Sequence, residues 1–338
     1  MKKRILLFLI VAFLYQNVLS QVSFEVDIDA QKFTQMKLSD ISAQNSFFVS
    51  LNISSILVTE IAGSYLFVSK LEALYQFDLS GKLIRTFSNN NRVFRGFSSD
   101  SRNNRLIILY DNEIEVRDFN ATFLKNILLP VPETIVGAKY RSSSRIIGFE
   151  ENNVWIFQEF EQNGRSVCRI CRLNIEDELM EIVLERDFPI FDFGSGVYLG
   201  YMAWYSSFGG KYYMGFHDNV IYEVDGKNVR PVVKYNIRNY REDIYDRLRL
   251  QINFTGRYFN LNYGTIGNRR KYFWFDVNDK QTWQVEGGIE DDIFHTGTLS
   301  TYSIQGEYLV FRKQERDLPI EMNVEKDHTV IFIIELKQ

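Results

Sequence analysis

Apolar and polar residues alternate along most of this chain, and short clusters of Asp, Asn and Gly interrupt the alternation. The stretch YQFDLSGKLIRTF, from Tyr75 to Phe87, contains two alternating segments on either side of the turn sequence LSGK. Alternation with a period of two predicts β-strands, and Asp, Asn and Gly tolerate the dihedral angles of tight turns. The 28 Phe and 19 Tyr residues favour pleated strands, and only five prolines interrupt them. The chain is therefore expected to be all-β.

The same unit recurs along the chain, and six copies can be aligned by their turns. A copy consists of an apolar strand, a polar turn, an alternating strand and, in most copies, a second turn with an outer strand. Another apolar strand precedes it, for example SSILVTEI at 54–61. The copies begin near Ser64, Asn104, Ser144, Lys211, Arg257 and Glu307.

Four antiparallel strands in roughly 40 to 50 residues are typical of a propeller blade. Six copies predict a six-bladed β-propeller of four-stranded blades, with extra length between blades three and four. The alternative is a pair of β-sandwiches or an irregular barrel.

The two ends of the chain supply complementary parts of one blade. The sixth copy stops after its third strand, HTVIFIIEL, whereas the N-terminal part has a spare strand, NSFFVSLN, at 45–52. We expect this strand to complete the last blade, which would satisfy its open edge.

The first 20 residues have the pattern of a secretory signal peptide. Lys2, Lys3 and Arg4 precede an apolar run from Ile5 to Tyr15, and small residues stand at a suitable cleavage position. A buried helix or a membrane anchor is the alternative. We expect a cleaved leader at 1–20 and a single propeller domain at 21–338, exported to the periplasm or the extracellular space.

Composition narrows the range of partners. The formal net charge is −4, and basic residues are interleaved with acidic ones, so we expect no general binding of nucleic acid. No apolar run beyond the leader is long enough to span a bilayer. We expect a monomer whose ligand is a protein or a carbohydrate.

Cys168 and Cys171 are the only cysteines, in the sequence VCRICRL. Zinc needs about four ligands, and no second Cys or His cluster exists. In an extended strand, residues three apart point to opposite faces, with Cα atoms too far apart for a disulfide. Two unpaired cysteines are expected; a local bulge that allows a bond is the alternative.

Four segments are distinctive when they are taken in order: KLSDI followed by FFVSLN, the first blade SYLFVSKLEALYQFDLSGKLIRTF, the segment NVIYEVDGKNVRPVVKYNI, and the ending TVIFIIELK. In these segments the chain resembles the six-bladed β-propellers common among exported proteins of Bacteroidetes-type bacteria. Such proteins often have a Gly-Pro-Gly-Glu loop after the first blade, where this chain has SNNNRVFRGF and keeps only Gly96. The resemblance implies a fold more than a function.

Motifs for catalysis are weak. The sialidase Asp-box is reduced to Thr282 and Trp283 in DVNDKQTW. Glu290, Asp291 and Asp292 are expected in a solvated loop, and no G-x-S-x-G nucleophile motif is present. We therefore predict no catalytic residues, no metal ligands and no cofactor. The alternative is a lactonase-like hydrolase or lyase with acidic residues, and Ca²⁺, in the central channel.

Binding is favoured by aromatic and arginine residues in the predicted loops. The loops from second to third strands, and from outer strands to the next blade, lie on one face of a propeller. The candidate ligand-binding residues there are Phe94, Arg95, Tyr201, Trp204, Tyr205, Tyr263, Arg269, Arg270 and His295. Aromatic rings stack on sugars and anchor protein interfaces, and Arg supplies directional donors. The alternative is that these aromatic side chains only fill the packing between blades.

Overall fold

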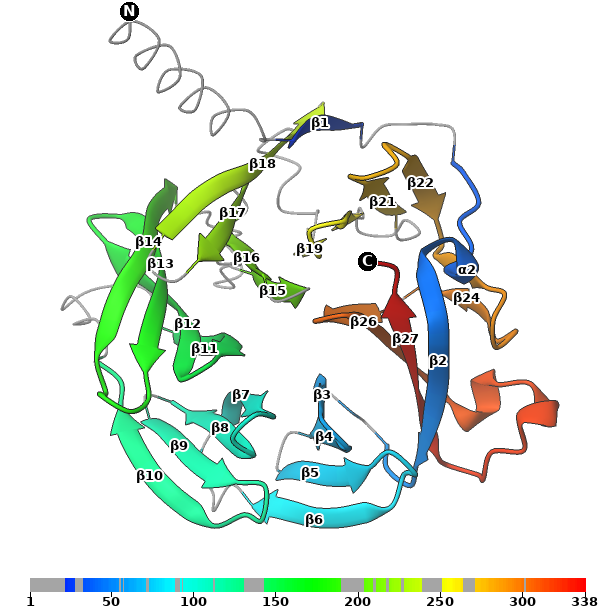
Figure 1. Cartoon of the computed structure of the whole chain (residues 1–338), viewed down its shortest axis with the longest axis horizontal. Coiled ribbons are helices and arrows are strands. Elements are labelled where there is room, and N and C mark those ends of the chain that lie inside the picture. The colour runs from blue at the N-terminus through cyan, green and yellow to red at the C-terminus, as the bar shows by residue number, and fades with distance from the viewer. Residues whose placement is uncertain are drawn as a thin grey trace, which may run out of the picture.

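In the computed structural model the chain forms a ring of sheets around a central axis (Figure 1). The residues that the structure describes are 22–27, 33–54, 56, 58–70, 73–88, 92, 94–111, 113–130, 143–189, 204–208, 211–216, 219–225, 228–238, 251–263, 271–300 and 302–338. The predicted leader at 1–20 lies outside them. No helix in these ranges is long and apolar enough to cross a membrane.

Six sheets of antiparallel strands make the six predicted blades, with the first strand of each innermost in the ring. Blade one consists of β3 (Val58–Ala62), β4 (Tyr65–Ser69), β5 (Ala73–Asp78) and β6 (Leu83–Ser88). Blade two consists of β7 (Phe94–Asp100), β8 (Arg105–Tyr110), β9 (Glu113–Asp118) and β10 (Phe123–Leu128). Blade three consists of β11 (Ser143–Glu150), β12 (Asn153–Gln162), β13 (Arg165–Asn174) and β14 (Met180–Pro189).

The second half of the ring follows the same order. Blade four consists of β15 (Trp204–Phe208), β16 (Lys211–Gly215), β17 (Val220–Asp225) and β18 (Asn228–Arg238). Blade five consists of β19 (Gln251–Phe254), β20 (Tyr258–Tyr263), β21 (Lys271–Asp276) and β22 (Thr282–Glu286). Blade six contains β25 (Tyr302–Gln305), β26 (Tyr308–Gln314) and β27 (Thr329–Leu336). Smaller elements join these strands: β23 (Ile289–Asp291), β24 (Gly297–Leu299), and the 3₁₀ turns η1 (Glu315–Asp317) and η2 (Ile320–Met322).

The N-terminal strand completes blade six, as the sequence predicts. β2 (Ser42–Leu51) lies antiparallel to β27, with Leu51 opposite Thr329 and Phe48 opposite Phe332. Val49 and Leu51 are buried in the core between blades six and one. The N-terminal and C-terminal segments therefore share one sheet, in which β2 covers the edge of β27 and is itself the outermost strand.

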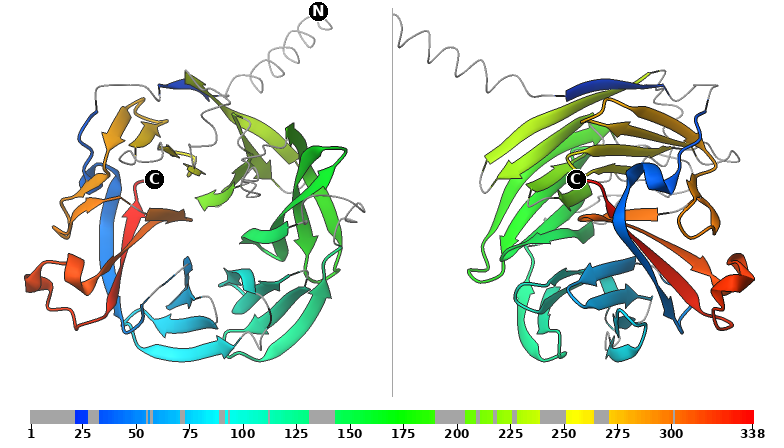
Figure 2. Two further views of the ribbon diagram at one scale, coloured as in Figure 1. Left: turned by 180° about the vertical axis from the view of Figure 1, so that it is seen from behind. Right: turned by 45° about the vertical axis from the view of Figure 1, so that its right-hand side comes forward.

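A strap at the N-terminus runs along the outside of three blades, which the repeat pattern does not predict. β1 (Val22–Asp27) adds to blade four as a fifth strand, parallel to β18. Residues 33–36 then pass blade five, where the Thr34 amide donates to the Gln284 carbonyl at 2.6 Å. The short helix α2 (Leu38–Ile41) leads into β2 in blade six. Figure 2 shows this path across the edge of the ring.

The core is divided among the interfaces between neighbouring blades. Trp274 of blade five and Phe332 of blade six belong to one such cluster. The two cysteines occupy different clusters: Cys171 faces blade two and Cys168 faces blade four. Both thiols are free and buried, so the prediction of unpaired cysteines is confirmed. Burial raises the pKa of Cys168 to about 12 and that of Cys171 to about 11, so neither is a reactive thiolate.

The two ends of the central axis carry different connections. We call the end with the first-to-second-strand turns, at 63–64, 101–104, 151–152 and 306–307, the turn face. The opposite end, with the second-to-third-strand loops and the connections between blades, is the loop face. Each of these four turns contains a residue with left-handed dihedrals: Gly63, Asn104, Glu151 and Gly306. Gly and Asn adopt that conformation readily, whereas Glu does so at a cost.

Candidate functional site

The described inner strands enclose a cavity of about 450 Å³ in the half of the ring next to the turn face. We call this cavity the chamber. Its lining comes from β3, β7, β11, β15 and β25, and thus from five of the six blades. The wall is mixed and somewhat more polar than apolar: Ser98, Ser99, Ser206 and Ser207 line it beside apolar side chains such as Ile146. Residues from separate strands thus converge on one cavity, which is where ligand sites are sought first.

Glu60, on β3, is one of the two acidic residues that line the chamber; the other is Glu307. Glu60 Oε1 accepts hydrogen bonds from the Ser99 amide at 2.8 Å, the Ser99 hydroxyl at 2.6 Å and the Ser98 hydroxyl at 3.3 Å. Burial in the wall of the ring outweighs these donors and raises the pKa of the Glu60 carboxyl to about 7. The carboxyl can therefore gain or lose a proton near neutral pH, a property that is common at functional sites.

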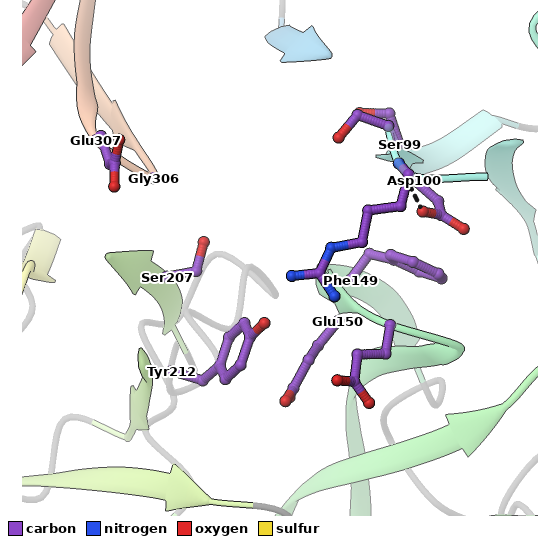
Figure 3. Close-up of a pocket in the computed structure, with 11 residues that line it drawn as sticks. Ser99, Asp100, Phe149, Glu150, Ser207, Tyr212, Gly306 and Glu307 are labelled. Carbon is purple, nitrogen blue, oxygen red and sulfur yellow. Dashed lines mark hydrogen bonds between the residues drawn. The ribbon is translucent and has the colours of Figure 1, made fainter. Parts of the chain in front are cut away.

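A second cavity of about 270 Å³ connects the chamber to solvent at the turn face, since the two share several lining residues. We call it the mouth. Residues at the ends of the first and second strands, or in the turns between them, form its rim, and they come from blades two, three, four and six. Figure 3 shows Ser207 and Tyr212 on the side nearer Gly306 and Glu307, with Phe149 and Glu150 opposite them.

Charged groups surround the mouth. Glu150, Glu151 and Glu307 line it, together with Asp100 and a single arginine, Arg102. Burial, followed by repulsion from neighbouring acids, raises the pKa of the Glu150 carboxyl, although the Trp155 indole donates to it at 3.3 Å. Burial and the charge of Glu150 likewise raise the pKa of the Tyr212 hydroxyl. The positive charge of Arg102 offsets part of this rise.

Hydrogen bonds to side chains hold the blade-two turn that carries Arg102 in place. Arg105 donates from Nε to Asp100 Oδ2 at 3.0 Å, and from Nη1 to Glu176 Oε1 at 2.6 Å in the neighbouring blade. Asp100 is almost fully buried, and its carboxylate also accepts from the backbone amide of Arg102 at 3.2 Å. Glu151 has a φ of +51°, a conformation that costs about 1 kcal/mol or more for a residue with a side chain. A strained residue at the rim of a cavity is a further indication of a functional site.

Those predicted binding residues that the structure describes lie on or near the loop face, away from the mouth. Phe94 and Arg95 begin β7; Phe94 is half-buried against Phe97, and Arg95 pairs with Asp111 at 2.8 Å. Tyr263 is buried in the core between blades four and five. His295 is exposed in the segment between β23 and β24.

The other predicted residues are only partly described. Trp204 and Tyr205 belong to β15, paired with Gly215 and Met214. Tyr201, Arg269 and Arg270 lie outside the described residues. The proposed loop-face site therefore stays a prediction.

The acidic loop after β22 is better ordered than expected. Asp291 is 3% exposed, and its carboxylate accepts from the amides of Ile293, Phe294 and Thr296. The Asp292 carboxylate accepts from the amide and hydroxyl of Ser39, at 3.0 and 2.6 Å. The expectation of a solvated loop is wrong for Asp291, because its oxygens stabilise a turn. Among the described residues, no group of three or more His, Cys, Asp or Glu side chains is placed to hold a metal ion.

Sequence reasoning missed the residues of the chamber and mouth, above all Glu60, Arg102, Glu150 and Tyr212. These four residues come from four different blades, and no contiguous motif contains two of them. One signal was present: Glu60 is the only charged residue in the inner-strand segment SSILVTEI, where a buried acid without partners is costly.

Together the six sheets and their ring define a six-bladed β-propeller. No protein-family model matches the chain, and no curated protein matches it in sequence. Among solved structures it is similar to the β-propeller domain of Myceliophteria thermophila Cps50 (Swd1), with 9% identity, a TM-score of 0.44, and coverage of 87% of this chain and 99% of that one.

Two bacterial structures are also similar. BamB from Moraxella catarrhalis has 11% identity and a TM-score of 0.42, with coverage of 80% of this chain and 72% of that one. A protein of unknown function from Bacteroides caccae has 8% identity and a TM-score of 0.41, with coverage of 78% and 88%.

Proposed function

We propose that the protein is an exported, non-catalytic binding propeller whose ligand, a segment of another protein or a glycan, enters the chamber through the mouth. The observation that carries this proposal is the continuity of the two cavities, which joins polar groups from five blades at one end of the ring. Phe149 and Tyr212 offer aromatic surface at the rim, and Glu150, Glu307 and Arg102 offer charged hydrogen-bonding groups. Aromatic rings next to directional polar groups suit both peptides and sugars.

The test is to plug the mouth and compare binding on a peptide array and a glycan array. Ser101 lines both cavities and is exposed, so Ser101→Trp fills the mouth with little disturbance of the fold. Gln44→Trp places the same side chain at an exposed site on β2 and is the matched control. We expect Ser101→Trp to lower the affinity for the strongest array ligand at least about tenfold, and Gln44→Trp to leave that affinity unchanged.

Binding that survives Ser101→Trp but is lost in Trp204→Ala with Arg269→Ala would move the site to the loop face. Both tryptophan variants should show the wild-type circular dichroism spectrum, so that a loss of binding reports the mouth and not misfolding.

A hydrolase or lyase is the second candidate, and the observation that favours it is Glu60. A carboxyl with a pKa of about 7 has the proton affinity that suits a general acid or base near neutral pH. Turnover of a lactone panel by the wild type, and its loss in Glu60→Gln, would establish this activity. Absence of turnover with intact ligand binding would leave the binding function alone.

A further inference from the structure

Only one of the two oxygens of the Glu60 carboxylate accepts hydrogen bonds from the described residues. All three of its hydrogen bonds, from Ser98 and Ser99, end on Oε1. No described residue donates to Oε2, and Glu60 lines the chamber. A carboxylate oxygen has capacity for about two hydrogen bonds, so Oε2 is available to a group that enters the chamber.

A second acceptor without a partner lies in the same wall. Gln305, on β25, donates from Nε2 to the Thr59 carbonyl, which fixes the orientation of its amide. Its Oε1 is buried and has no hydrogen-bond partner among the described residues. Because this oxygen has almost no accessible surface, a ligand in the chamber does not reach it. Among the described residues, Glu60 Oε2 is therefore the acceptor that the chamber offers to a donor.

The charged residues around the chamber are mostly acidic, which also favours a cationic ligand. Among the described residues that line it, the ionisable ones are Glu60, Glu307 and Tyr308, and no Lys or Arg is present. At the mouth, Glu150, Glu151 and Glu307 outnumber Arg102; Asp100 there is already paired with Arg105. Aligned charges of one sign in a low-dielectric cleft attract ions of the opposite sign.

Resting on the proposed binding function, we propose that the chamber accepts a slender organic cation, an alkylammonium or guanidinium group, with Glu60 as its counter-ion. The cation donates to Glu60 Oε2, which gives the carboxylate a counter-ion. Its chain passes between Phe149 and Tyr212 at the mouth, where Glu150 and Glu307 attract it. A Lys or Arg side chain of a peptide and a free polyamine share this chemistry.

The pH dependence of binding follows from the ionisation of Glu60. The free chamber holds a proton on this carboxyl below about pH 7, and the cation requires the ionised form. Binding therefore releases up to one proton, and affinity falls by up to about tenfold for each pH unit below 7. Glu307, Tyr308, Glu150, Glu151, Asp100, Arg102 and Tyr212 are the other charged or titratable groups that face the chamber and its mouth.

The experiment is a ¹³C NMR titration of the Glu60 carboxyl in the full chain with three probes. The peptide acetyl-Gly-Lys-Gly-amide and spermidine are the cations, and acetyl-Gly-norleucine-Gly-amide is the neutral match. We expect at least one cation to lower the titration midpoint of Glu60 by about one pH unit or more, and the neutral peptide to leave it unchanged. A stronger effect of the peptide would assign the cation to a protein partner, and a stronger effect of spermidine to a free amine.

Glu60→Gln keeps the size and the acceptor oxygen of the side chain and removes its charge. We expect it to weaken the effective cation at least about tenfold and to abolish the pH dependence. Glu286→Gln, at an exposed position on β22, removes one negative charge far from the chamber and should change neither.

The inference is overturned if neither cation moves the Glu60 midpoint, or if the neutral peptide moves it equally. If Ser101→Trp still abolishes binding of the array ligand in that case, the proposed binding function stands and only the assignment of a cationic ligand is wrong.

Discussion

Gly81 shows how one residue without a side chain lets two blades meet. It lies in the turn between β5 and β6 with a φ of +88°, and a Cβ atom there would be 2.2 Å from the Ser50 carbonyl oxygen on β2. The left-handed backbone and the contact with the closing strand both require Gly. The Asp78 carboxylate fixes the same turn by accepting from the amides of Ser80 and Lys82 at 2.9 and 3.0 Å.

Gly81→Ala should therefore destabilise the protein by on the order of 2–3 kcal/mol, because the methyl group adds a clash to the cost of a left-handed alanine. Gly63→Ala is the matched control. Gly63 also has a positive φ, +58°, but a Cβ atom added there would meet no described atom within 4 Å. It should lose only about 1 kcal/mol. Urea unfolding of both variants measures the difference, and equal losses would show that Ser50 moves aside without cost.

Among the elements, β2 contributes most to closing the ring. Leu51 is fully buried where blade six meets blade one, in a cluster with Leu66 and Ile331. Leu51→Ala should cost about 2–5 kcal/mol, as truncation of a buried leucine usually does. Gln44→Ala, on the exposed part of the same strand, should be nearly neutral. Thermal and urea unfolding test both, and a small loss for Leu51→Ala would mean that the ring stays closed without tight packing of this strand.

Local alternation was enough to predict the blades, because a strand with one face in each inter-blade core carries its pattern in its own sequence. The terminal strand of blade six was predictable for the same reason: the last copy lacked one strand and 45–52 was spare. The pairing of β1 with β18 was not, since a parallel partner about two hundred residues away leaves no local trace. Tertiary packing favours this position of β1: the centroid of the Phe24 ring lies 4.6 Å from that of Phe259 and 4.7 Å from that of Phe275.

The chamber could not be predicted from the sequence for a related reason. β3, β7, β15 and β25 contribute one or two polar residues each, such as Glu60, Ser99 and Gln305, and these lie tens to hundreds of residues apart in the sequence. Only closure of the ring brings them to one end. The sequence search favoured aromatic loop residues instead, because those are conspicuous without knowledge of the ring.

At the scale of the whole molecule, Glu60 links the site to stability. Its pKa is 4.5 in the unfolded chain and about 7 in the folded one, because burial disfavours the charged form. Below pH 4.5 the carboxyl is protonated in both the folded and the unfolded state, so it causes no loss of folding stability. As the pH rises from 4.5 to 7 the unfolded state ionises first, so the folded state loses stability until the loss levels off above pH 7. The difference between 4.5 and about 7 corresponds to a loss of about 3 kcal/mol.

Glu60→Gln should remove this loss, since an amide does not ionise and still accepts from Ser98 and Ser99. The variant is expected to match the wild type near pH 4 and to exceed it by up to about 3 kcal/mol at pH 8. Urea unfolding at the two pH values is the measurement, with Glu286→Gln as the exposed control. A gain of the same size at both pH values would mean that the carboxyl titrates normally. A gain confined to pH 8 would show that the fold carries an acid which costs stability at neutral pH, as expected of a group held in place to meet a ligand.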